Sequence, residues 1–377
     1  MPMRVGPGIA SAIALLLCAP ATALGATVLE VAAVDGANLQ RPSWSPDATR
    51  LSYEANYHQV KTIELYVGDP ENRTFRRLKG ARRSTTPITA GFVTATPATQ
   101  VVNELAWGRG NGSGYVFSAA AETQDFDLYM DGGGAIAIAP GADGGPKWSP
   151  DGARLVFTSA RTGDGDLYVL SADTMEAAPK RVTSAAGSSE LFADWSPDSR
   201  SLVYVAHGDT GDHVWLLPTL DGEPRQLTTE PGSQVRPTFS PDGKRVAYYS
   251  MAPPGSPDAL DQWALVVREL GADAVPVVLA EDVKPDLSGP AWTPSGDHLI
   301  AVRNDPDALD PVAWVPATPG GETIDIDLGT VNHGDVSVVA SGGALRLAFI
   351  AQGRVDDAVR AFKRLYMTTL PVSPPAQ

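Results

Sequence analysis

The sequence WSPDG at residues 148–152 decides the fold, because close copies of it recur along the chain. The other clear copies are WSPD at 44–47, WSPD at 195–198, FSPDG at 239–243 and WTPSG at 292–296. Two degraded copies, one at Trp107 and one at 340–343, complete the series. The copies follow one another at intervals of roughly 40 to 60 residues, which is the repeat length of a β-propeller blade.

The motif itself encodes a turn between two strands. Serine at the first turn position, proline at the second and glycine at the fourth suit a type I turn, because proline fixes φ near the required value. A short β-rich run, RLVF at 154–157, follows the turn. A third run, DLYV at 166–169, and a fourth, KRVT at 180–183, come next. Each repeat is therefore predicted to form a four-stranded antiparallel sheet.

A single sheet of this kind exposes apolar residues on both faces and is stable only when neighbouring sheets cover them. A closed ring of sheets meets this requirement and leaves no open end. The sequence therefore predicts an all-β fold, a single β-propeller of four-stranded antiparallel blades over residues 26–370. Seven copies favour seven blades, and the poor copy at Trp107 leaves six blades as an alternative.

The last repeat lacks one strand. After the copy at 340–343 only two more strands follow, and the second ends with LYMT at 365–368. The β-rich segment Val28–Val34 precedes the first repeat and belongs to no blade of its own. We predict that it pairs with the strand around Tyr366 and so closes the ring. The proline-rich residues 371–377 are predicted to form a disordered tail.

Residues 1–25 are typical of a secretory signal peptide. Arg4 is the only charged residue before Glu30, and Ile9–Ala19 is an apolar run too short to span a bilayer. Ala21–Ala23 and Ala23–Gly25 each offer a cleavage site with small residues. We expect the mature protein to be periplasmic or secreted, with no membrane span after cleavage. A buried N-terminal helix is the alternative.

The only cysteine, Cys18, lies inside this leader, so the mature chain is predicted to hold no disulfide and no thiol site. Lipidation of Cys18 is the alternative, which the bulky Leu17 before it disfavours. The formal net charge is −15. A surface this acidic repels phosphate groups and anionic lipid headgroups, which makes nucleic acid and membrane surfaces poor partners.

The combination of [Trp/Phe]-Ser-Pro-Asp-Gly, a strand and Asp-Leu-Tyr-Val resembles the repeat of the TolB-like β-propeller family, and the resemblance covers residues 40–370. It implies the propeller fold. TolB itself carries a further domain before its propeller, and related peptidases carry a hydrolase domain. Resemblance to the related lyases would imply a histidine-rich metal site in the central channel. In this chain the first repeat follows the leader almost directly, no G-x-S-x-G motif occurs, and there are five histidines.

We therefore expect an exported, monomeric binding or scaffold protein of the cell envelope, without a cofactor, whose partner is another envelope or periplasmic protein. The alternative is a saccharide-active lyase or hydrolase, or a small-ligand binder, with its site in the central channel. Such a site needs inward-facing acids, arginines and histidines, and the sequence shows no concentration of them beyond the loop aspartates. The fold alone does not decide between these functions.

The loops between the second and third strands carry aspartates in one repeat after another. In a propeller these loops emerge on one face, which predicts an acidic face for a cationic partner or for divalent ions. A solvated rim is the alternative, because aspartate is a favoured turn residue. The candidate residues are Asp125, Asp127, Asp164, Asp166, Asp209, Asp212, Asp258, Asp261, Asp307 and Asp310.

One of these loops also holds the weaker candidates for a metal site. Two histidines flank two aspartates within its seven residues. These side chains are ligands of divalent cations, and aspartate suits calcium in particular. A loop made only of good turn formers is the alternative. The candidate ligands are His207, Asp209, Asp212 and His213.

Overall fold

The computed structural model describes residues 27–375, except for 60–61, 79–87, 91–92, 96–101, 109–113, 121–124, 132–134, 137–138, 176, 210, 252–261, 272, 306 and 356–357. The predicted leader lies outside these residues, and so do Asp258 and Asp261 of the predicted acidic face. None of the helices in the described segments is long and apolar enough to cross a membrane.

The described residues are almost entirely β-structure, as the repeats predict. The strands fall into successive antiparallel groups, numbered 1 to 7 below in chain order, and each is given from its inner to its outer strand. Group 1 is β2 (Asn38–Trp44), β3 (Leu51–Tyr57), β4 (Thr62–Asp69) and β5 (Thr74–Arg77); group 2 is β8 (Val102–Trp107), β9 (Tyr115–Ala120) and β10 (Phe126–Met130); group 3 is β11 (Asp143–Trp148), β12 (Arg154–Ser159), β13 (Asp166–Ser171) and β14 (Lys180–Arg181); group 4 is β15 (Ser189–Trp195), β16 (Leu202–Gly208), β17 (Gly211–Leu217) and β18 (Arg225–Gln226).

The remaining groups follow the same plan. Group 5 is β19 (Gln234–Phe239), β20 (Arg245–Met251), β21 (Trp263–Glu269) and β22 (Val277–Lys284); group 6 is β23 (Ala291–Trp292), β24 (His298–Arg303), β25 (Val312–Pro316) and β26 (Ile324–Ile326); group 7 is β27 (Val336–Ser341), β28 (Ala344–Ala351), β31 (Arg364–Leu370) and β1 (Leu29–Ala32). The short elements β6 (Ile88–Ala90), β7 (Val93–Ala95), η1 (Ala172–Thr174), β29 (Arg354–Val355) and β30 (Ala358–Val359) lie in connections.

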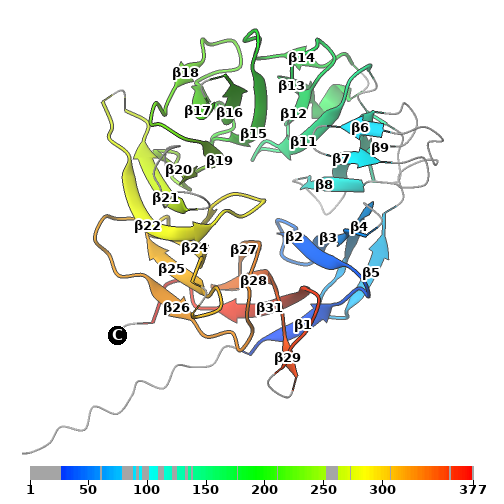
Figure 1. Cartoon of the computed structure of the whole chain (residues 1–377). Coiled ribbons are helices and arrows are strands. Elements are labelled where there is room, and N and C mark those ends of the chain that lie inside the picture. The colour runs from blue at the N-terminus through cyan, green and yellow to red at the C-terminus, as the bar shows by residue number, and fades with distance from the viewer. Residues whose placement is uncertain are drawn as a thin grey trace, which may run out of the picture.

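The groups are arranged in a ring, with β2, β8, β11, β15, β19 and β27 nearest its centre (Figure 1). This is a β-propeller. Pairing between β22 and β24 joins groups 5 and 6 into one eight-stranded sheet. The number of blades therefore stays a prediction.

The hydrophobic core is divided among the interfaces between neighbouring groups. One cluster, for example, joins Val156 and Leu167 of group 3 to Trp195 and Leu202 of group 4. Each sheet is thus covered on both faces by its neighbours, as the apolar pattern of the repeats requires.

The repeated motif forms the expected turn. In group 3 the amide of Gly152 donates to the carbonyl of Ser149 (2.8 Å), and Gly152 has a φ of 73°. Glycine adopts this left-handed conformation without a steric cost, so its place in the motif has a clear reason. Two copies lack glycine, and their Ala48 and Ser199 still adopt φ values of 57° and 63°.

The motif aromatic and the arginine after the turn join each group to the next. The indole Nε1 of Trp195 in group 4 donates to the carbonyl of Lys147 in group 3 (3.1 Å). Arg154 of group 3 lies over the Trp195 ring, 5.2 Å from its centroid, and donates to the carbonyl of Ser199 (2.6 Å). The same stacking recurs for Arg50 over Trp107, Arg245 over Trp292 and Arg346 over Trp44. The repeat therefore encodes contacts between sheets as well as a turn.

The predicted closure of the ring is confirmed. Strand β1 pairs antiparallel with β31, and Glu30 lies opposite Tyr366. The Glu30 carboxylate also forms ion pairs with Arg360 (3.1 Å) and Arg364 (2.7 Å). The first and last strands of the described chain thus share one sheet.

Candidate functional site

Three of the predicted acidic-face residues are buried. Asp127 and Asp166 have no exposed surface, because each lies in the third strand of its group. Asp166 pairs with Arg181 of the neighbouring strand (2.8 Å). Asp310 is 7% exposed and pairs with Lys284. Asp166 and Asp310 thus form ion pairs within the fold, and the expectation that these three aspartates contribute to an exposed face is wrong.

The exposed part of the predicted face is smaller. Asp164, Asp209 and Asp307 are exposed in loops, and Asp125 and Asp212 are half-buried. These five residues, named the acidic rim below, lie in or beside the loops between second and third strands. The further role of this rim stays a prediction.

The residues proposed as metal ligands do not share one face. His207 lies opposite Asp212 in the β16–β17 ladder, and its Nδ1 is 2.5 Å from that carboxylate. His213 follows Asp212 directly, so its side chain projects from the other face of the sheet. There its Nδ1 is 2.8 Å from Oε1 of Gln234. Throughout the described segments, no cluster of three or more histidine, cysteine, aspartate or glutamate residues could hold a metal ion.

A cavity of about 320 Å³ lies among the inner strands at the centre of the ring. Four residues of its wall occupy equivalent positions: Arg41 of β2, Glu104 of β8, Phe192 of β15 and Arg236 of β19. Each lies at a β-bulge with a φ of 48°, 54°, 55° and 58°, respectively. The bulge turns the side chain out of the regular alternation of the strand. The repeat therefore supplies one wall residue from each of these strands.

The cavity lies toward the end of the sheets that carries the motif turns, because Pro46 of the first turn contributes to its wall. Successive hairpin loops of an antiparallel sheet lie at opposite ends. The acidic rim therefore lies at the other end of the ring. The predicted binding residues and the central cavity are two separate sites.

The two arginines of the cavity differ in their partners. Arg41 forms ion pairs with Glu54 (3.3 Å) and Glu104 (3.5 Å). Arg236 lies over the Phe192 ring, 3.7 Å from its centroid, and within the described part of the chain it forms no hydrogen bond or ion pair. Burial, and then the positive charge of Arg41, lower the pKa of Arg236 to about 10. The nearby carboxylates thus do not fully compensate for its burial.

Two aspartates close to the cavity hold neighbouring inner strands together. Asp335 accepts hydrogen bonds from the backbone amides of Arg41 (2.7 Å) and Leu287 (3.0 Å). Asp286, which is 4% exposed, accepts bonds from the amides of Ser288 and Val336. Burial and the neighbouring Asp335 raise the pKa of Asp286 well above its usual value.

The ring therefore does concentrate acids and arginines near its axis. The expectation that the sequence holds no such concentration is wrong, because Arg41, Asp335 and their partners are far apart in the sequence. The backbone amide of Arg41 and the carboxylate of Asp335, for example, are separated by 294 residues. Only closure of the ring brings them together.

The raised pKa of Asp286 predicts that the protein loses stability as the pH rises. The folded protein keeps this proton at pH values above 3.8, where the unfolded chain has lost it. The free energy of unfolding should therefore fall by roughly 1–3 kcal/mol between about pH 5 and about pH 8 through this group. Urea unfolding at both pH values measures the change. Asp286→Asn should reduce the fall, whereas the exposed Asp273→Asn should not, and an identical slope in all three proteins would contradict the assignment.

Known proteins share parts of this sequence. The family model of the TolB beta propeller domain matches residues 126–307. The chain is 30% identical over 105 residues to a TolB homolog of Chlorobium chlorochromatii, which covers 28% of this chain and 23% of the relative. It is 30% identical over 150 residues to the uncharacterized protein Atu1656 of Agrobacterium fabrum, which covers 34% of this chain and 49% of that protein. The chain thus spans less than half the length of either relative.

Solved structures share the fold at lower identity. A puromycin hydrolase superposes with a TM-score of 0.63 at 14% identity, over 92% of this chain and 55% of that chain. An oligogalacturonate lyase in complex with manganese superposes with a TM-score of 0.59 at 13% identity, over 93% of this chain and 94% of that chain. At these identities the likeness concerns the fold alone.

Proposed function

Because the chain belongs to the TolB-like β-propeller family, we propose that it is an exported module that binds another cell-envelope protein through its central cavity. The observation that carries this proposal is Arg236, a half-buried cation of the cavity wall that stacks on Phe192 and has no ion pair or side-chain hydrogen bond within the described residues. The leader-like residues 1–25 support export.

The chemistry of Arg236 favours an anionic group as the recognised feature. A guanidinium group has five N–H donors in a planar fork, which fits a carboxylate in a bidentate manner. Phe192 supports one face of this group and leaves its edge for a ligand. A bound carboxylate would restore the charge balance that burial of Arg236 disturbs.

The size of the cavity limits what enters it. About 320 Å³ accommodates an acidic side chain or a chain terminus, and not a folded domain. The rest of the partner would contact the face that carries the motif turns. We therefore propose that a short acidic segment of the partner anchors the complex.

The acids of the cavity are engaged in the fold, which favours binding over catalysis. Asp286 and Asp335 each accept two backbone hydrogen bonds, and Glu104 accepts one from Gly145 (2.6 Å). A general acid or base needs a free position beside the reacting group. These carboxylates instead hold the inner strands at the positions that shape the cavity.

Capture from an envelope extract tests this proposal. The mature protein and its Arg236→Gln variant are used as bait, and the captured proteins are identified by mass spectrometry. Glutamine keeps hydrogen-bonding capacity but removes the charge, so the partner should bind the variant at least about tenfold more weakly. The exposed Arg77→Gln, at the end of the outer strand β5 and outside the motif turns, serves as the matched control and should bind like the wild type. Equal capture by Arg236→Gln and wild type would refute the role of the cavity.

A further inference from the structure

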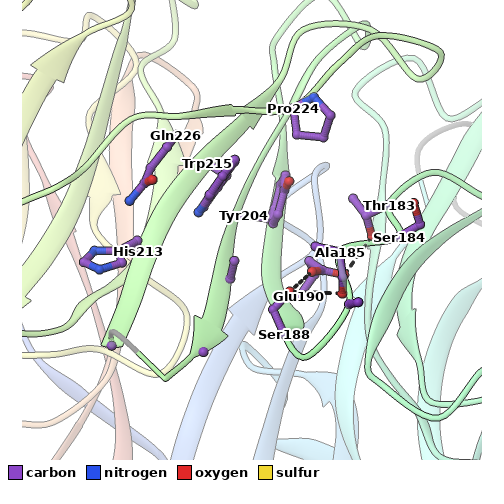
Figure 2. Close-up of a pocket in the computed structure, with 14 residues that line it drawn as sticks. Thr183, Ser184, Ala185, Ser188, Glu190, Tyr204, His213, Trp215, Pro224 and Gln226 are labelled. Atoms are coloured by element: carbon purple, nitrogen blue, oxygen red, sulfur yellow. Dashed lines mark hydrogen bonds between the residues drawn. The ribbon is translucent and has the colours of Figure 1, made fainter.

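A second cavity, separate from the central one, lies in a crevice beside the outer strands of group 4 (Figure 2). Its volume is about 420 Å³. One wall is the face of β16, β17 and β18, and the other is the segment 183–188 that connects β14 to β15. Small residues keep the crevice open, namely Ala185, Ala186, Ala206 and Gly208.

The sheet wall of the crevice combines aromatic and polar side chains. Tyr204 lies opposite Trp215, and Trp215 lies opposite Gln226, so all three project from one face. His213, two residues before Trp215 and opposite Ala206, projects from the same face. Figure 2 shows His213, Gln226, Trp215 and Tyr204 on the strands across from the connecting segment that carries Ser188. A flat apolar body would find a stacking surface here.

His213 presents a hydrogen-bond acceptor. The amide nitrogen of Gln234 donates to the carbonyls of Glu230 (3.2 Å) and Pro231 (3.4 Å), so its oxygen is the acceptor that faces His213. Nδ1 of His213, 2.8 Å from that oxygen, therefore carries the proton. In the neutral ring Nε2 is then the unprotonated nitrogen. A ligand that fits this position must donate a hydrogen bond.

Glu190 adds an acid to the opposite side of the crevice. It is 1% exposed and accepts hydrogen bonds from the hydroxyls of Ser188 (2.6 Å) and Thr183 (3.0 Å). A carboxylate offers about four acceptor positions, so these two bonds do not saturate it. Burial, with the neighbouring Asp166, raises the pKa of Glu190 to about 7. A cation bound beside Glu190 would favour its ionised form.

The surface around the crevice also carries negative charge. Asp164 of the acidic rim is exposed and accepts a hydrogen bond from the amide of Gly187 (3.2 Å), which lies in the connecting segment. Asp209 is exposed in the loop after β16, next to Gly208 of the crevice wall. Exposed carboxylates at the mouth of a cleft raise the local concentration of cations.

We propose that this crevice binds a small organic cation, with its ammonium group directed to Glu190 and its apolar body against Tyr204 and Trp215. His213 Nε2, across the crevice from Glu190, would accept a hydrogen bond from a ligand that carries a second donor. A cation near an indole ring gains a further favourable interaction. This site lies apart from the central cavity, so it is an addition to the proposed partner binding.

Calorimetry with a matched pair of probes tests the proposal. The probe is 2-phenylethylamine, and the control is 2-phenylethanol, which keeps the ring and loses the charge. At about pH 8 the amine should bind the wild type at least about tenfold more tightly than the alcohol. Glu190→Gln should weaken the amine at least about fivefold, whereas the exposed Glu223→Gln beside the crevice should not.

The pH dependence gives a second readout. An alkylammonium group stays protonated at both about pH 6 and about pH 8, whereas Glu190 gains a proton between them. Binding of the amine to the wild type should therefore weaken several-fold at the lower pH, and the decrease should be smaller in Glu190→Gln, which lacks the contribution of Glu190.

Three results would overturn the proposal: equal affinity for amine and alcohol, unchanged amine binding in Glu190→Gln, or no binding of the amine up to about 10 mM. Thermal melting establishes that the variant is folded. Should Glu190→Gln not fold, the amine-to-alcohol comparison, the pH profile of the wild type and the variant Trp215→Leu decide the question. Trp215→Leu should weaken both probes while the amine stays the tighter one.

Discussion

Removal of residues 27–34 from the mature protein is expected to lower its melting temperature by about 10 °C or more. This segment contains β1, which supplies the outer strand of group 7. Its loss exposes the edge of β31 and the apolar surface that Val31, 4% exposed, now covers. It also removes the Glu30 ion pairs with Arg360 and Arg364. Together these losses lower the free energy of unfolding by several kcal/mol. In a domain of 150–250 residues, each kcal/mol lost lowers the melting temperature by about 2–4 °C.

Scanning calorimetry or circular dichroism measures this change. The control is deletion of residues 372–377, which follow the last strand and should leave the melting temperature within about 2 °C of the wild type. A deletion of 27–34 that melts like this control would show that β1 does not hold the ring closed.

The variant Arg346→Ala is expected to lower the free energy of unfolding by about 2–4 kcal/mol. Arg346 of group 7 lies 4.3 Å from the centroid of the Trp44 ring in group 1 and donates to the carbonyl of Ala48 (2.8 Å). It also pairs with Glu71 of group 1. Alanine would remove all three contacts at the interface where the two ends of the ring meet.

Arg154→Ala provides the comparison, because Arg154 makes equivalent contacts with Trp195 and Ser199 between groups 3 and 4. The chain runs directly from β14 of group 3 to β15 of group 4. Between groups 7 and 1 it runs only from β1 to β2, and β1 itself is held in group 7 by its non-covalent pairing with β31. We expect Arg346→Ala to be the more destabilising of the two in urea unfolding. A loss below about 0.5 kcal/mol for Arg346→Ala would mean that the closing interface does not depend on this stacking.

The wall of the central cavity has a signal in the sequence outside the motif turn. Arg41, Glu104, Phe192 and Arg236 each lie three residues before the motif aromatic of their own repeat. The residue three positions before each motif aromatic marks the cavity wall, because a repeated bulge places this residue near the axis in each of these repeats.

The sequence contains no comparable signal for the burial of Asp127 and Asp166. Both follow a loop and begin an Asp-Leu-Tyr run, so from the sequence alone they look like the exposed Asp164. What separates them is the partner that the neighbouring strand supplies, which for Asp166 is Arg181. An aspartate at the start of a strand is buried or exposed according to the sheet packed against it.

The sequence by itself determined the propeller, the turn of each repeat and the strand that closes the ring. These features are local and repeated, so each copy of the motif reports the same hairpin and the same packing surface. Only the tertiary structure decided which charged residues meet. Arg41 and Asp335 come together through ring closure across 294 residues, and the same arrangement leaves Arg236 without an ion pair among the residues that the structure describes. Burial and charge pairing depend on neighbours that the fold supplies, and a linear pattern does not contain them.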